Sequence, residues 1–71
     1  MEVIKEGALV ELEGRYPSQI VLRLIKPGVY ATHIKVCPPD ADSYFILGNY
    51  FFILSEADAD FDKRVVELQG P

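Results

Sequence analysis

The sequence of 71 residues contains one cysteine, one histidine and no tryptophan. The single cysteine, Cys37, excludes a disulfide within the chain, and no Cys/His cluster is present to hold a structural metal. Asp58, Asp60 and Asp62 alternate as at the start of a calcium loop, but Lys63 stands where such a loop needs glycine. We therefore predict neither a metal nor another cofactor.

Motifs for catalysis are also missing. The sequence has no G-x-S-x-G segment, and its five glycines are dispersed rather than gathered into a phosphate-binding loop. His33 and Cys37 stand four residues apart in an extended segment. Their Cα atoms would be about 13 Å apart, too far for a thiolate–imidazole pair. We predict that the chain is not an enzyme.

Positive charge is scarce, with seven Lys and Arg against eleven Asp and Glu and a net charge of −4. The basic residues are scattered, whereas nucleic-acid binding depends on a stripe of them that neutralises phosphates. We therefore predict no nucleic-acid partner. Residues 38–71 hold most of the excess acid, which leaves open a role as a small acidic inhibitor of a basic partner.

Long hydrophobic runs are absent. The longest uncharged apolar stretch, residues 44–54, is shorter than the roughly 20 residues of a membrane-spanning helix. The first residues show no charged region followed by an apolar one, so we expect no signal peptide. A lone cysteine is typical of a reducing compartment, and a cytoplasmic location without membrane contact is predicted.

Hydrophobic residues make up 49% of the sequence, which excludes a disordered chain. We predict one small domain over residues 1–71. A domain of this length buries only about 60% of its unfolded surface, so its core is marginal without further support. Association with another chain is the form of support most open to it.

Short apolar segments between Gly, Pro, Asn, Asp and Ser residues predict strands over 8–13, 19–26 and 29–37. Pro27-Gly28 suits the centre of a type II turn, so the second and third segments form a hairpin. In the third segment, Ala31, His33 and Lys35 form the more polar face. The apolar runs 44–47 and 50–54 are joined by Gly48-Asn49, either as a hairpin turn or as a bulge in one long strand.

The C-terminal segment fits two structures. Ser55 and the acids after it resemble a helix N-cap, the apolar residues of 57–68 recur at helical spacing, and Gly70-Pro71 is a suitable stop. Residues 63–68 could alternatively form a last strand that pairs with the first. The predicted fold is mainly β, an antiparallel roll or partly open barrel of five or six strands. A C-terminal helix or a final strand closes it.

Both faces of segments 19–26 and 44–54 are apolar, whereas a half-buried sheet has one apolar face and one polar face. A helix could cover part of this area, and the remainder would be an exposed apolar patch of the kind that marks interaction surfaces. The predicted function is a protein-interaction module, an accessory or regulatory subunit, that forms a homo-oligomer. The predicted interaction surface comprises Tyr44, Ile46, Phe51, Ile53, Val21 and Ile25.

A small-molecule binding protein is the alternative. An apolar pocket could form at the mouth of a barrel or at an oligomer interface, with a few polar groups to orient the ligand. The predicted polar anchors of such a pocket are Arg23, Tyr30 and His33.

Overall fold

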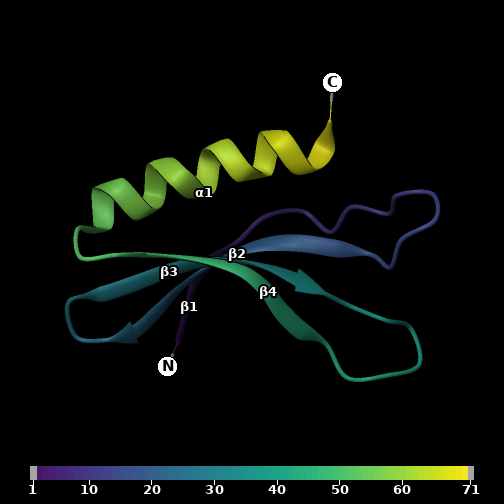
Figure 1. The fold of residues 1–71 in the computed structure, drawn as a ribbon, viewed down its shortest axis with the longest axis horizontal. Helices are drawn as coiled ribbons and strands as arrows, with labels where there is room; N and C mark the ends of the chain where they lie inside the picture. The colour runs from purple at the N-terminus through teal and green to yellow at the C-terminus, as the bar shows by residue number, and fades with distance from the viewer. Residues whose placement is uncertain (1, 71) are drawn as a thin grey trace.

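A computed structural model describes residues 2–70 as four strands followed by one helix (Figure 1). The elements are β1 (Glu2–Glu6), β2 (Ser18–Lys26), β3 (Val29–Val36), β4 (Tyr44–Phe51) and α1 (Leu54–Gln69). The β2–β3 hairpin is confirmed. Gly28 at its turn has a φ of 80°, the positive value that the second central position of a type II turn requires.

The strands form a single antiparallel sheet in the order β1-β2-β3-β4, so each strand pairs with its neighbour in the chain. The mainly β character is confirmed, but the sheet is open, with β1 and β4 at its edges. The prediction of five or six strands in a roll or barrel is wrong. The described residues have four strands, because 44–51 is one strand and the C-terminal segment is a helix.

The first strand also differs from the prediction. Residues 2–6 form β1, whereas in segment 8–13 only Val10 makes an isolated bridge, to Ser18. The pattern of apolar residues did not predict this strand, because Glu2, Lys5 and Glu6 are charged. An edge strand tolerates such charges because much of it faces water.

Strand β4 contains a bulge and no hairpin turn. Its pairing with β3 shifts register between Thr32 and Ile34, and Leu47 adopts a φ of 53° there. Tyr44, Ile46 and Phe51 share one face, and Phe45 and Tyr50 lie on the other, as the opposing residues of β3 show. Both faces of this strand are therefore apolar, as predicted.

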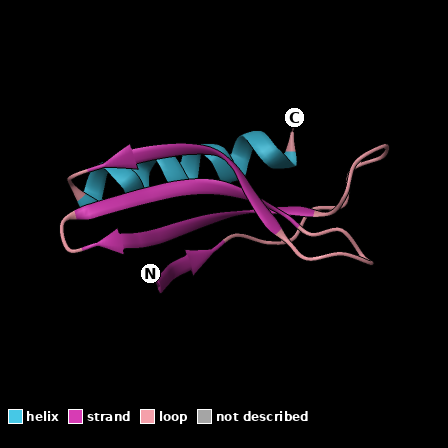
Figure 2. Cartoon of the chain, turned by 60° about the horizontal axis from the view of Figure 1, so that its bottom comes forward, coloured by secondary structure: helices cyan, strands magenta, loops and turns pink. Residues whose placement is uncertain are grey.

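Helix α1 lies against one face of the sheet (Figure 2), so the helical alternative is correct and the final strand is not formed. Ser55 is not the N-cap. Ile53 occupies that position without a side-chain hydrogen bond, and the N–H of Gly70 closes the other end by bonding to the carbonyls of Val66 and Glu67. Pro71, the second residue of the predicted stop, lies outside the described residues.

The hydrophobic core lies between α1 and the sheet. Its buried members are Ile20, Leu22, Ala57 and Phe61. Half-buried apolar side chains pack around these four, among them Phe51 from β4 and Leu68 from the last turn of α1. No helix within residues 2–70 has the length and hydrophobicity needed to cross a membrane.

Candidate interaction surface

Strand β4 is an edge strand without a single charged residue. All of its apolar side chains except Phe51 are exposed, with Leu47 and Tyr50 at 68% and 61%, and the exposure continues into the residues that lead to α1. We define the β4 edge surface as Tyr44, Phe45, Ile46, Leu47, Tyr50, Phe52 and Ile53. An edge strand also presents backbone N–H and C=O groups that can pair with another chain.

The opposite edge of the sheet is different. Strand β1 has five residues, of which Glu2, Lys5 and Glu6 are charged, and its pairing with β2 is irregular between Val3 and Lys5. Short length, charge and a bulge are the features by which proteins discourage pairing at an edge. The sheet therefore has one protected edge and one apolar edge.

The face of the sheet away from α1 carries a small cluster of rings. The His33 ring lies 5.5 Å from that of Phe45 and 5.7 Å from that of Tyr50, measured between centroids. The Arg23 guanidinium lies 4.0 Å from the centre of the Phe45 ring, a cation–π distance. Gly48 lies against the His33 ring, since a Cβ atom added there would be 2.5 Å from Nε2 of His33. We call these five residues the far-face cluster: Arg23, His33, Phe45, Gly48 and Tyr50.

His33 is 7% exposed, although the sequence placed it on the more polar face of its strand. Its Nδ1 atom is buried and has no hydrogen-bond partner among the described residues. Burial lowers the pKa of His33 below its ordinary value of 6.5, and the nearby charges of Arg23 and Arg64 lower it further. Ala31 on the same face is fully buried, because longer side chains on β2 and β4 flank it.

Acidification is expected to destabilise this cluster. Because the pKa of His33 is lower in the folded chain than in the unfolded chain, the unfolded chain binds its proton more readily. The stability due to neutral His33 is fully present above about pH 6.5 and is lost as the pH falls through the folded pKa. Urea midpoints at pH 7.5 and 5.0 should differ more for the wild type than for His33→Gln. An equal difference in both proteins would contradict this assignment.

On the helix side, a polar network joins α1 to the sheet. The buried Thr32 hydroxyl donates to Asp60 Oδ2 at 2.6 Å, and Asn49 Nδ2 donates to the same oxygen at 3.1 Å. Arg64 Nη1 donates to the Thr32 carbonyl at 3.2 Å and to its hydroxyl oxygen at 3.1 Å. Thr32 is satisfied by these bonds, and β3, β4 and α1 are tied together at one point.

A second polar contact joins α1 to β1. The Lys5 ammonium pairs with Asp58, lies 3.9 Å from Asp62 and sits 4.7 Å above the centre of the Phe61 ring. Its hydrogen bond to Asp58 raises the pKa of Lys5. Asp60 instead contacts β3 and β4, so the three aspartates of the helix do not converge on one point.

The residues of the predicted interaction surface are placed differently from one another. Tyr44, Ile46 and Ile53 are exposed, Phe51 packs against the core, and Ile25 is half-buried at the end of β2. Val21 is fully buried and offers no surface to a partner. Sequence reasoning did not include Phe45, Leu47, Tyr50 and Phe52 in this surface. Their membership follows from the position of β4 at an edge.

The three predicted pocket anchors do not come together. Arg23 and His33 both adjoin Phe45 on the far face of the sheet. Tyr30 packs against the core on the helix side. The side chains of the far-face cluster pack against one another, and none of them lines a described cavity.

Comparison with known protein families, with curated proteins and with solved structures finds no match to this chain.

Proposed function

We propose that this chain is a non-catalytic protein-interaction module that self-associates by placing the β4 edge surfaces of two copies against each other. The single observation that carries the proposal is an edge strand of eight residues without charge, exposed on both of its faces. Antiparallel pairing of two such strands about a two-fold axis extends the sheet from one copy into the next. A module of this kind suits an accessory or regulatory subunit.

Charge supports a second copy as the occupant. Each chain carries a net charge of −4, so two copies repel, and this repulsion is weakest where their contact avoids acidic groups. Residues 44–54 are uncharged, whereas acids precede them at Asp40 and Asp42 and follow them at Glu56. Contact through β4 keeps these like charges at the rim of the interface, where water and salt screen them.

The bulge at Leu47 and Gly48 shapes this contact. It divides β4 into two short regular segments, so continuous backbone pairing between two copies is limited in length. The exposed side chains of Phe45, Ile46 and Tyr50 then supply much of the buried area. Large aromatic and aliphatic side chains are the groups that most often dominate the energy of an interface.

Lysine substitutions on β4 test the proposal. We expect the wild type to sediment as a dimer or a larger oligomer at micromolar concentration. Ile46→Lys or Tyr44→Lys should weaken association at least tenfold, which corresponds to about 1.4 kcal/mol. Phe51 is unsuitable for this test because it packs against the core.

Val3→Lys is the matched control, because Val3 on the β1 edge is 46% exposed and Ile46 is 39% exposed. It adds the same charge to the protected edge and should leave the oligomer intact. Circular dichroism establishes that each variant is folded. A wild type that remains monomeric throughout the micromolar range would overturn the proposal, as would β4 variants that associate like the wild type.

A further inference from the structure

His33, the only histidine of the chain, lies directly behind the β4 edge surface. Its imidazole contacts Phe45 and Tyr50, which are exposed members of that surface. Because His33 itself is buried, these two side chains separate its imidazole from water. Histidine is the side chain whose charge most readily changes near neutral pH. A group that can change its charge therefore adjoins the surface proposed to bind a second copy.

The surroundings of the imidazole do not suit its protonated form. Imidazolium carries an N–H on both nitrogens as well as a positive charge. Nδ1 of His33 is buried and has no hydrogen-bond partner within residues 2–70, so an N–H at this atom lacks an acceptor. Burial of a charge without such a partner is costly. The fold therefore favours the neutral imidazole, in agreement with the lowered pKa of His33.

The charged groups closest to the imidazole are positive. Arg23 on β2 and Arg64 on α1 both act to lower the pKa of His33. Lys35 follows on the same face of β3, as the pairing with β2 shows. From β4 the imidazole is met by the Tyr50 phenol.

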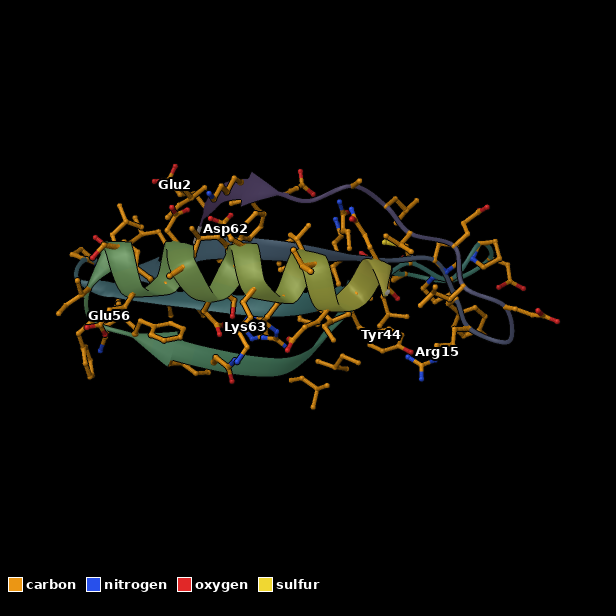
Figure 3. All side chains as sticks on the ribbon, turned by 90° about the horizontal axis from the view of Figure 1, so that it is seen from above. Glu2, Arg15, Tyr44, Glu56, Asp62 and Lys63 are labelled. Carbon is orange, nitrogen blue, oxygen red and sulfur yellow. The ribbon has the colours of Figure 1, made fainter. Side chains whose placement is uncertain are left out.

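The acidic side chains lie farther from the imidazole. On the same face, Glu6 of β1 is two strands away, about 10 Å by the register of the sheet. Asp60 lies on the helix side, where it accepts hydrogen bonds from β3 and β4. Asp58 and Asp62 pair with Lys5 on the β1 side of α1, as Figure 3 shows for Asp62. None of these acids packs against the imidazole, so protonation would add a positive charge next to other positive charges.

We propose that self-association through the β4 edge surface is pH-sensitive and that His33 is the group that controls it. This inference rests on the proposed function, because it concerns the same surface. A protonated imidazole reaches water only if Phe45 or Tyr50 moves aside, and either movement alters the surface that a second copy contacts. A second copy in turn covers both side chains and keeps water from the imidazole. The chain therefore associates when His33 is neutral and dissociates when it is protonated.

The remaining titratable groups act in the opposite direction. Each chain has a net charge of −4, and its carboxylates begin to take up protons as the pH falls toward 5. Their protonation weakens the repulsion between two copies and favours association. A loss of association on acidification therefore distinguishes His33 from the general effect of charge.

Sedimentation of the full chain at micromolar concentration and constant ionic strength, at pH 7.5 and 5.0, tests the proposal. We expect the wild type to associate at least tenfold more weakly at pH 5.0, while circular dichroism shows that it is still folded. His33→Gln is the matched control, because glutamine does not titrate. Its association should be unchanged or stronger at pH 5.0.

The outcomes separate this inference from the proposed function. A wild type that is monomeric at pH 7.5 would overturn both. A wild type that associates equally at the two pH values would overturn only the role of His33. The same loss of association in His33→Gln would do so too, as would a wild type that unfolds at pH 5.0 rather than dissociating as a folded chain.

An NMR titration of the imidazole gives a second readout, which requires no change at His33 and decides the matter if His33→Gln does not associate. Because proton uptake and association are linked, the pKa of His33 should be lower in the associated wild type than in monomeric Ile46→Lys. Ile46 lies opposite Ile34, on the helix side of β4. The added lysine would by itself lower the pKa of His33, so a higher pKa in the variant reports the loss of the second copy. Equal pKa values would overturn the inference.

Discussion

Replacing Phe61 with alanine is expected to lower the free energy of unfolding by about 3–5 kcal/mol. Phe61 is 6% exposed and is the largest buried side chain that α1 contributes to the core. It packs with Ile20 and Leu22 of β2, and the Lys5 ammonium lies above its ring. Alanine would leave a cavity at the centre of the apolar contact between the helix and the sheet.

A loss of this size would remove much of the stability of so small a domain. Native domains are stable by about 0.05–0.15 kcal/mol per residue, or roughly 4–11 kcal/mol for a chain of this length. Urea denaturation followed by far-ultraviolet circular dichroism measures the change. Val66→Ala on the same helix is the control, because Val66 is 68% exposed and its truncation should alter stability by less than about 0.5 kcal/mol. Equal effects of the two substitutions would show that α1 does not dock on the sheet through Phe61.

Replacing Gly48 with alanine is expected to destabilise the fold by about 1–3 kcal/mol, the usual cost of overpacking a filled site. The added Cβ would lie 2.5 Å from Nε2 and 2.9 Å from Cδ2 of His33. The His33 ring is held between Phe45 and Tyr50 and has little room to move. Gly48 does not have a left-handed backbone, so the cost arises from the contact with the ring.

A double-mutant cycle isolates that contact. Truncating the ring in His33→Ala removes the atoms that the new Cβ would meet. In this background Gly48→Ala should cost less than about 0.5 kcal/mol, which gives a coupling of at least about 0.5 kcal/mol between the two sites. If Gly48→Ala costs the same with and without the ring, then the bulge of β4 does not rest on His33.

Local signals made the β2–β3 hairpin and the helical spacing of residues 57–68 predictable. The hairpin depends on Pro27-Gly28 and on two adjoining apolar segments, so all of its determinants lie close together in the chain. The two-sided apolar character of β4 was predictable for the same reason. Strand β1 was not, because its charged residues become a strand only by pairing with β2, far along the chain.

The interaction surface could be predicted only in part. Tyr44 and Ile46 were identified from their apolar surroundings, but nothing in the pattern showed that Val21 is fully buried. The choice between a turn and a bulge at Gly48 was also open, since both keep the same residues on each face. The groove between the C-terminal half of α1 and the sheet could not be foreseen, because its lining residues Leu12, Leu47 and Leu68 come from distant parts of the chain.

By itself, the amino-acid sequence determined a small acidic domain, mainly β, with more apolar residues in its middle segments than one sheet face can bury. These are properties of composition and of short-range alternation, which do not depend on distant contacts. Only the tertiary structure decided which face α1 covers, which strand lies at the exposed edge, and that His33 is buried. Those outcomes depend on the strand order and on which of the two apolar sheet faces the single helix covers. Both are decided by packing between parts of the chain that are distant in sequence.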